Sequence, residues 1–129
     1  MKTKEEIKSI AKTSIEIEGN SILQLGDYVG DEFVSIVHQL LKSDGRLVVT
    51  GIGKSANIAQ KLVATFNSTG QPAIFMHAAD AIHGDLGYVQ DGDLVMCISK
   101  SGNTPEIKAL VPLLTSMGNE IIAMTGNRE

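Results

Sequence analysis

Four short, uniformly apolar runs separated by longer amphipathic segments constrain the fold of this 129-residue chain more than any other feature. Each run is too short for a typical helix. It also lacks the alternation of polar and apolar residues that is typical of a strand with one solvent-exposed face. Both traits are expected of parallel strands that are covered on both sides. The runs occupy residues 47–52, 73–77, 94–99 and 121–125. The sequence therefore predicts an α/β fold with a flavodoxin-like parallel sheet built from βαβ units.

Helical periodicity fills most of the remaining chain. The predicted helices occupy residues 5–25, 29–41, 55–67, 79–83 and 105–117. His38 is expected on the exposed surface of the second helix. We expect residues 1–45 to form N-terminal packing helices of the same domain as the βαβ region 46–129. A sheet of this kind usually continues beyond a fourth strand, so we also expect the C-terminal part of the domain to be missing.

Composition narrows the classes of function. Hydrophobic residues make up 43% of the chain and the net charge is −4, which argues against a nucleic acid as the main partner. Aromatic residues make up only 4%, too few for a platform that stacks single-stranded bases. No run of eighteen apolar residues or signal-like segment occurs, so we expect a cytoplasmic protein without a membrane partner.

The chain has a single cysteine, Cys97, in the middle of an apolar run. One cysteine cannot form an internal disulfide framework or a cysteine-cluster metal site. We expect Cys97 to be a buried structural thiol rather than a nucleophile.

The first candidate motif, Gly51-Ile52-Gly53-Lys54-Ser55, follows the first predicted strand. Glycines allow the backbone to turn tightly and to approach a ligand closely. The helix that follows presents free N–H groups and the positive end of its dipole to an anion. An ordinary strand–helix turn would also explain the glycines, but Lys54 beside them favours an anion site.

Two familiar nucleotide-binding patterns fit this motif poorly. A P-loop requires a glycine at the position of Val48. The spacing of Gly51, Gly53 and Ala56 matches a dinucleotide fingerprint, but no acidic residue for the ribose ends the strand at 73–77. A nicotinamide-binding or flavodoxin-like function is therefore disfavoured.

The second motif, residues 99–106, follows the third predicted strand and leads into a helix. Thr104 suits the N-cap and Pro105 the first helical position, so capping alone explains these two residues. Capping does not explain Ser99 and Ser101, and hydroxyls together with free N–H groups form a phosphate cup. Both motifs end neighbouring strands, where ligands of α/β sheets bind. The predicted phosphate-binding residues are Gly53, Ser55, Ser99, Ser101, Gly102, Asn103 and Thr104.

The third motif holds His77, Asp80, His83 and Asp85 within nine residues. The two histidines are six residues apart, which is not a regular metal-ligand spacing, so we expect no metal. His83 could serve as a catalytic group or as a hydrogen-bonded structural residue, and the residues alone leave both open.

These motifs, in this order, resemble the sugar isomerase (SIS) domain, and more narrowly the arabinose-5-phosphate isomerases of the KpsF/GutQ type. The resemblance is carried by residues 51–55, 64–70, 83–87 and 99–107 and spans essentially the whole chain. It implies an SIS-type αβα sandwich.

The resemblance also implies an activity, the interconversion of D-arabinose 5-phosphate and D-ribulose 5-phosphate, which supplies Kdo and lipopolysaccharide synthesis. Lys54, His83 and Glu106 match active-site positions of the family, and the chemistry requires neither a metal nor a redox cofactor. Family members form homo-oligomers, so a dimer or tetramer with sites near the subunit interfaces is implied. The alternative is a non-catalytic sugar-phosphate-binding sensor module. The family domain continues past this point with a further active-site glutamate and histidine, so the activity of the 129 residues by themselves is left open.

Overall fold

A computed structural model describes residues 1–127 of the chain. The last two residues of the predicted region 46–129 therefore lie outside the described residues. The chain divides after His38 into two compact units, an N-terminal helical unit and a larger α/β unit.

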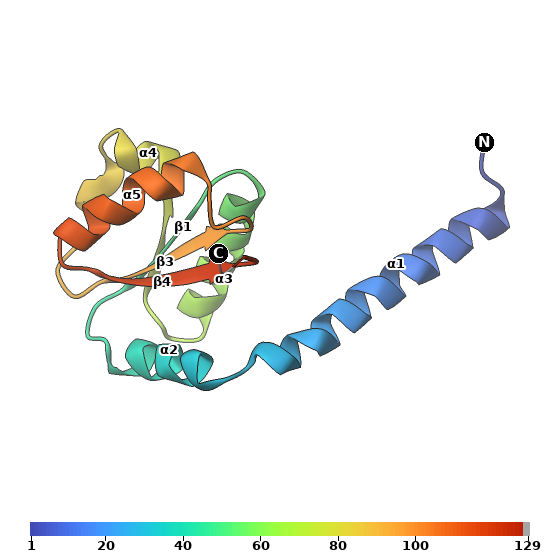
Figure 1. Ribbon diagram of the computed structural model, residues 1–129, viewed down its shortest axis with the longest axis horizontal. Coiled ribbons are helices and arrows are strands. Elements are labelled where there is room, and N and C mark those ends of the chain that lie inside the picture. The colour runs from blue at the N-terminus through green and yellow to red at the C-terminus, as the bar shows by residue number, and fades with distance from the viewer. Residues whose placement is uncertain (128–129) are drawn as a thin grey trace. The chain divides into compact units, whose positions relative to one another are not determined.

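The α/β unit is built on a four-stranded parallel sheet, as predicted (Figure 1). Its strands are β1 (Leu47–Gly51), β2 (Ala73–His77), β3 (Leu94–Ser99) and β4 (Glu120–Thr125). Their order across the sheet is β2-β1-β3-β4, and every neighbouring pair is parallel. β1 and β3 are buried along their whole length, which explains why their sequences are uniformly apolar.

Helices cover both faces of this sheet. α3 (Lys54–Ser68) lies on one face, and α4 (Ala78–Ile82) and α5 (Pro105–Ser116) pack together on the other (Figure 1). A short 3-10 helix, η2 (Asp85–Tyr88), follows α4 and was not expected from the sequence. The α/β sandwich is therefore as predicted, and the helix bounds differ from the expected ones by one or two residues.

The core on the α4 and α5 side is apolar and tightly packed. Its fully buried side chains include Val48 and Val95 from the sheet and Leu110 and Leu114 from α5. Their helical spacing of four places both leucines on the inner face of α5. On the other face, the small side chains of α3 at Ala56 and Ala59 are also buried against the sheet.

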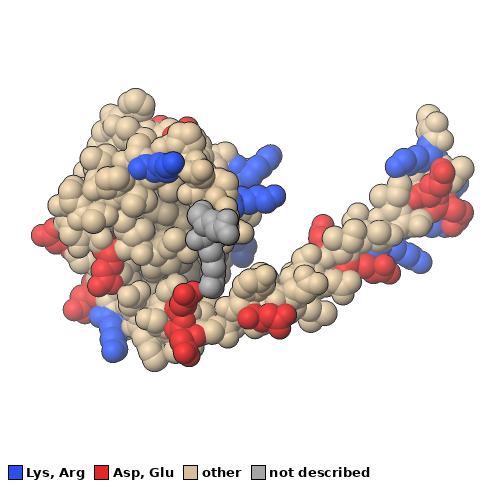
Figure 2. Space-filling view, viewed as in Figure 1, with Lys and Arg blue, Asp and Glu red and all other residues tan. Residues whose placement is uncertain are grey.

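The N-terminal unit begins with α1 (Lys4–Gln24), where Thr3 and Glu6 form a capping box. A 3-10 helix, η1 (Leu25–Tyr28), follows, and α2 (Asp31–Lys42) crosses the division between the units. His38 is exposed, as expected. Figure 2 shows acidic and basic side chains interspersed along α1 and over the visible face of the α/β unit. None of the helices within residues 1–127 combines the length and apolar character needed to cross a bilayer.

The strand order creates a topological switch point between β1 and β3. From β1 the chain continues to β2 on one side, whereas from β3 it continues to β4 on the other side. Ligands of open α/β sheets bind in the crevice at the carboxyl ends of such strands. The first and second motifs, residues 51–55 and 99–106, are called the two Gly/Ser motifs below. They start at the carboxyl ends of these two strands and lie side by side, because Gly51 at the end of β1 is paired with Ile98 near the end of β3.

Candidate functional site

The turn after β1 brings the start of α3 close to the end of the strand. Gly51 permits this approach, since a Cβ there would lie 3.0–3.2 Å from Ser55 and the Ala56 nitrogen. Gly53 is the N-cap of α3 and has φ +56°, a conformation that favours glycine. Lys54 and Ser55 then open the helix, Lys54 exposed and Ser55 half-buried. The sequence thus places a lysine and free helix-start N–H groups beside the switch point.

The loop after β3 carries the three hydroxyls of the second motif. The Ser99 side chain is 5% exposed, and its Oγ lies 2.7 Å from Thr104 Oγ1. Ser101 is exposed, and its Oγ accepts a hydrogen bond from the Asn103 N–H at 3.1 Å. Gly102 has φ +69°, and its N–H donates to the Ser99 carbonyl. The loop is therefore a tight turn that holds Ser99 against Thr104 and leaves Ser101 at the surface.

Thr104 occupies the predicted N-cap position, but its hydroxyl has a different partner from a usual N-cap side chain. Thr104 is the N-cap residue of α5 and Pro105 follows it in the first turn, as expected, but the Thr104 hydroxyl makes no capping hydrogen bond. It pairs with Ser99 instead, because the loop folds the two side chains together. Glu106 lies in the first turn of α5 and is half-buried. A carboxylate in this position is favoured by the helix dipole.

The third motif spreads along the end of β2 and through α4. His77 ends β2, and its Nδ1 lies 3.6 Å from Asp80 Oδ2 but makes no hydrogen bond among the described residues. We regard this contact as weak, because the Asp80 side chain is 65% exposed and the distance is long. His83 follows α4 and is exposed. Within residues 1–127, no group of three His, Cys, Asp or Glu side chains is arranged to hold a metal ion.

Two buried polar groups lie in the strands behind the site. Cys97 is a free, buried thiol, as expected, and burial raises its pKa to about 11. The hydroxyl of Thr50 is fully buried and has no hydrogen-bond partner within the described part of the chain. Thr50 pairs in register with Cys97 on β3 and with Met76 on β2.

Sequence reasoning missed a contact between the loop after β3, residues 99–104 (the hydroxyl loop), and the turn after β4. The Gly126 N–H donates to the Lys100 carbonyl at 3.1 Å. A Cβ on Gly102 would lie 3.0 Å from Thr125 Oγ1. A glycine and an asparagine after the last strand signalled a turn, but nothing local signalled what the turn would touch.

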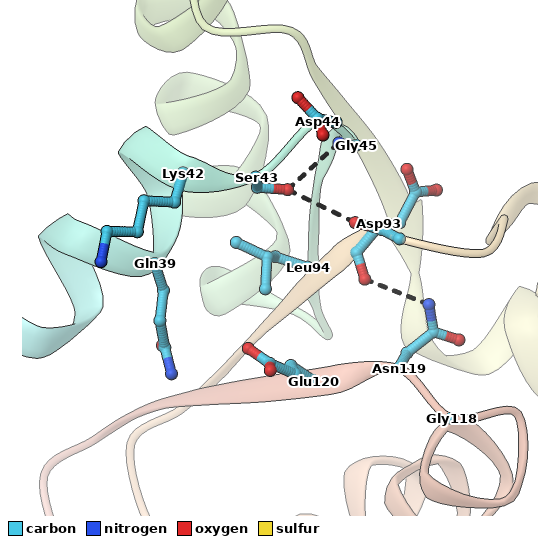
Figure 3. A pocket seen from close by; sticks show the side chains of 11 residues that line it. Gln39, Lys42, Ser43, Asp44, Gly45, Asp93, Leu94, Gly118, Asn119 and Glu120 are labelled. Carbon is cyan, nitrogen blue, oxygen red and sulfur yellow. Dashed lines mark hydrogen bonds between the residues drawn. The ribbon is translucent and has the colours of Figure 1, made fainter.

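A separate pocket of about 520 Å³ lies at the opposite, amino end of the strands (Figure 3). Its inner polar groups hydrogen-bond to one another: Ser43 Oγ donates to the Gly92 carbonyl, and Asn119 Nδ2 donates to the Asp93 carbonyl. The Asp93 carboxylate accepts from Arg46 Nη2 at 2.7 Å and from the Gln90 N–H at 2.9 Å. Because these inner groups are already paired, and because both motifs lie at the carboxyl ends of β1 and β3, we assign the candidate site to the carboxyl end.

Comparison with known proteins agrees with this geometry. The family model described as SIS domain matches residues 39–129. A probable arabinose 5-phosphate isomerase of Haemophilus influenzae is 48% identical over 119 residues, which cover 92% of this chain and 35% of that protein. The arabinose 5-phosphate isomerase GutQ of Escherichia coli K12 is 38% identical over 122 residues, covering 95% of this chain and 38% of that protein. The chain thus spans little more than a third of the length of these curated relatives.

Solved structures share the fold closely. The protein c3406 of E. coli CFT073, solved in complex with arabinose 5-phosphate, has a TM-score of 0.94 and 38% identity, covering 99% of this chain and 68% of that one. A putative sugar-phosphate isomerase from Listeria monocytogenes has a TM-score of 0.95 and 35% identity, covering all of this chain and 68% of that one. The parallel sheet, the two strand-end motifs and these matches agree, and the chain belongs to the SIS domain family.

Proposed function

We propose that this chain is the sugar-phosphate-binding part of an aldose–ketose isomerase that interconverts D-arabinose 5-phosphate and D-ribulose 5-phosphate. The observation that carries the proposal is the pair of Gly/Ser motifs at one switch point, in a chain that matches an arabinose 5-phosphate complex over 99% of its length. The curated relatives named above have the same activity in their names.

The phosphate group would bind to the loop after β3. Ser99, Ser101 and Thr104 supply hydroxyl donors, and Gly102 and Asn103 supply backbone around them. Gly53 and Ser55 would close the other side of the phosphate from the start of α3, where the helix dipole favours an anion. This arrangement needs no metal to balance the charge, because N–H and O–H groups can solvate a phosphate.

The chemistry would use three side chains around the sugar end of the substrate. A carboxylate base, for which Glu106 is the candidate, removes the proton from C2 of the aldose and returns it to C1. The proton on the C2 hydroxyl moves to the oxygen on C1, so the enediol intermediate collapses to the ketose with atoms and charges balanced. Lys54 or His83 would stabilise the negative charge that develops on the oxygens. A positioned base of this kind contributes roughly 10²–10⁴-fold to the rate.

A homo-oligomer with its sites near subunit interfaces is part of the proposal. It is supported by α1, which is not buried by the rest of its own N-terminal unit although it carries many isoleucines. The isoleucines of α1 that are at least 46% exposed are Ile7, Ile10, Ile15, Ile17 and Ile22. Exposed apolar surface of this kind favours association. We further propose that the protein is cytoplasmic and that its product enters Kdo synthesis.

An assay of ribulose 5-phosphate formation from arabinose 5-phosphate tests the function. We expect Glu106→Gln to lower kcat by roughly 100-fold or more relative to the wild type, with unchanged affinity for inorganic phosphate. Glu120→Gln is the matched control, because Glu120 is exposed at the start of β4, at the other end of the sheet. Full turnover by Glu106→Gln would refute the role of Glu106. Phosphate binding without any turnover would mean either a sensor module or an enzyme that needs more of the protein than these 129 residues, and the same assay on the full-length protein would distinguish the two.

A further inference from the structure

The turn that follows β4 is in direct contact with the hydroxyl loop. The Gly126 N–H donates a hydrogen bond of 3.1 Å to the Lys100 carbonyl, and Lys100 stands between Ser99 and Ser101. A single hydrogen bond thus links the end of the fourth strand to the middle of the proposed phosphate cup.

This bond fixes the orientation of one peptide unit. The Lys100 carbonyl and the Ser101 N–H belong to the same trans peptide and point in opposite directions. Since the carbonyl points at Gly126, the Ser101 N–H must point away from the turn. Ser101 N makes no hydrogen bond among the described residues, so its N–H is available to an anion.

The two chain segments also fit together without room for extra atoms. A Cβ on Gly126 would lie 3.0 Å from the Lys100 carbonyl oxygen, and one on Gly102 would lie 3.0 Å from Thr125 Oγ1. Contacts this close would require one segment to move. The φ angle of Gly126 lies outside the left-handed region, so alanine there would be resisted by the contact and not by its own backbone.

The turn itself is braced by the Thr125 side chain. Thr125 Oγ1 donates to the Asn127 carbonyl at 3.0 Å and accepts from the Asn127 N–H at 3.2 Å. Both hydrogen bonds hold Gly126 at the tip of the turn, facing Lys100.

We infer that Thr125 and Gly126 are positioning residues for the phosphate: they hold the Lys100 peptide so that the Ser101 N–H is presented to the ligand. The inference rests on the proposed function in one respect, namely that the ligand is the phosphate group of a sugar phosphate. The contact that it depends on is present without any ligand.

Gly126→Ala tests the inference, with Gly26→Ala as the matched control because a Cβ there meets nothing within 4 Å. Hydrogen–deuterium exchange of residues 99–104 in the unliganded chain should become faster in Gly126→Ala and stay unchanged in Gly26→Ala. The Kd for inorganic phosphate, measured by titration calorimetry, should rise roughly tenfold, the effect expected when one hydrogen bond to a charged group is lost. In the isomerase assay, KM should rise while kcat stays near its wild-type value.

Thr125→Val and Thr125→Ser provide a second test if Gly126→Ala fails to fold. Valine keeps the shape but loses both hydrogen bonds, so it should behave like Gly126→Ala, whereas serine should restore phosphate binding. Unchanged exchange in residues 99–104, or faster exchange with an unchanged phosphate Kd, would overturn the inference. If the wild-type chain bound no phosphate, the proposed function would fail, and the exchange data alone would still decide whether the turn holds the loop.

Discussion

At the amino end of the sheet, the Asp93 side chain is 2% exposed and accepts hydrogen bonds from the backbone and guanidinium of Arg46 and from the Gln90 N–H. At the carboxyl end, Ser101 and Lys54 are exposed. Both ends are rich in polar groups, but the inner groups of the first end, Ser43, Asp93 and Asn119, bond within the protein. Ser101 and Lys54 at the second end face the solvent. A concentration of polar residues therefore does not by itself identify a ligand site. What marks it is polar groups that the fold has left without enough partners.

The paired groups at the amino end also shift one another's protonation. Burial by itself would raise the pKa of Asp93, but the hydrogen bonds from Arg46 and Gln90 together outweigh it, and the pKa of this carboxyl is lowered. The hydrogen bond to Asp93 in turn raises the pKa of the Arg46 guanidinium. The two pKa shifts are opposite in sign and both favour the charged form, as expected of a stabilising ion pair that is partly shielded from solvent.

The largest effect should come from breaking this pair. We expect Asp93→Asn to lower the free energy of unfolding by about 3 kcal/mol, because it leaves the partly buried Arg46 charge without its counter-ion. Urea unfolding followed by circular dichroism measures it. Asp91→Asn is the control, since Asp91 is exposed two residues away and should cost less than about 0.5 kcal/mol. Equal effects of the two variants would refute the contrast between the two ends.

A smaller effect, on ligand binding and not on the free energy of unfolding, is expected at the carboxyl end. Ser101→Ala should weaken the binding of inorganic phosphate about tenfold while changing the free energy of unfolding by less than about 1 kcal/mol, because the side chain is exposed and bonds only locally. Ser116→Ala, which removes an exposed hydroxyl at the end of α5, is the control for both measurements. If Ser101→Ala destabilised the fold and left phosphate binding intact, the loop would be structural and not a binding site.

The smallest effect is expected when the pH is lowered from 7 to 5, a range in which the contribution of Asp93 to stability should not change. The folded-state pKa of Asp93 is lowered, so its contribution to stability is fully present above the unfolded value of about 3.9 and is lost as the pH falls from there through the folded pKa. The difference in unfolding free energy between wild type and Asp93→Asn should therefore stay constant from pH 7 to pH 5 and shrink below about pH 4. A difference that already shrank between pH 7 and pH 5 would contradict a lowered pKa.

Much of the local structure could be predicted because it depends on neighbours in the sequence. The apolar runs of β1 and β3 have the pattern of strands buried on both faces, and the spacing of Leu110 and Leu114 indicates the inner side of α5. The short helix η2 was missed, since four residues around a glycine carry too little periodicity to be recognised. The catalytic roles of Lys54, His83 and Glu106 stay predictions.

The α/β class, the approximate element bounds and the two Gly/Ser motifs could be inferred from the amino-acid sequence alone, because periodicity and turn chemistry act over a few residues. The three-dimensional structure was needed to show that the Thr104 hydroxyl pairs with Ser99 in place of capping α5, and that Gly126 bonds to Lys100. The reason is physical. The Gly126–Lys100 bond joins two segments that the pairing of β3 with β4 brings together, and the Ser99–Thr104 contact depends on how the loop after β3 closes. No local preference of the chain encodes which partner a free hydroxyl or carbonyl will meet.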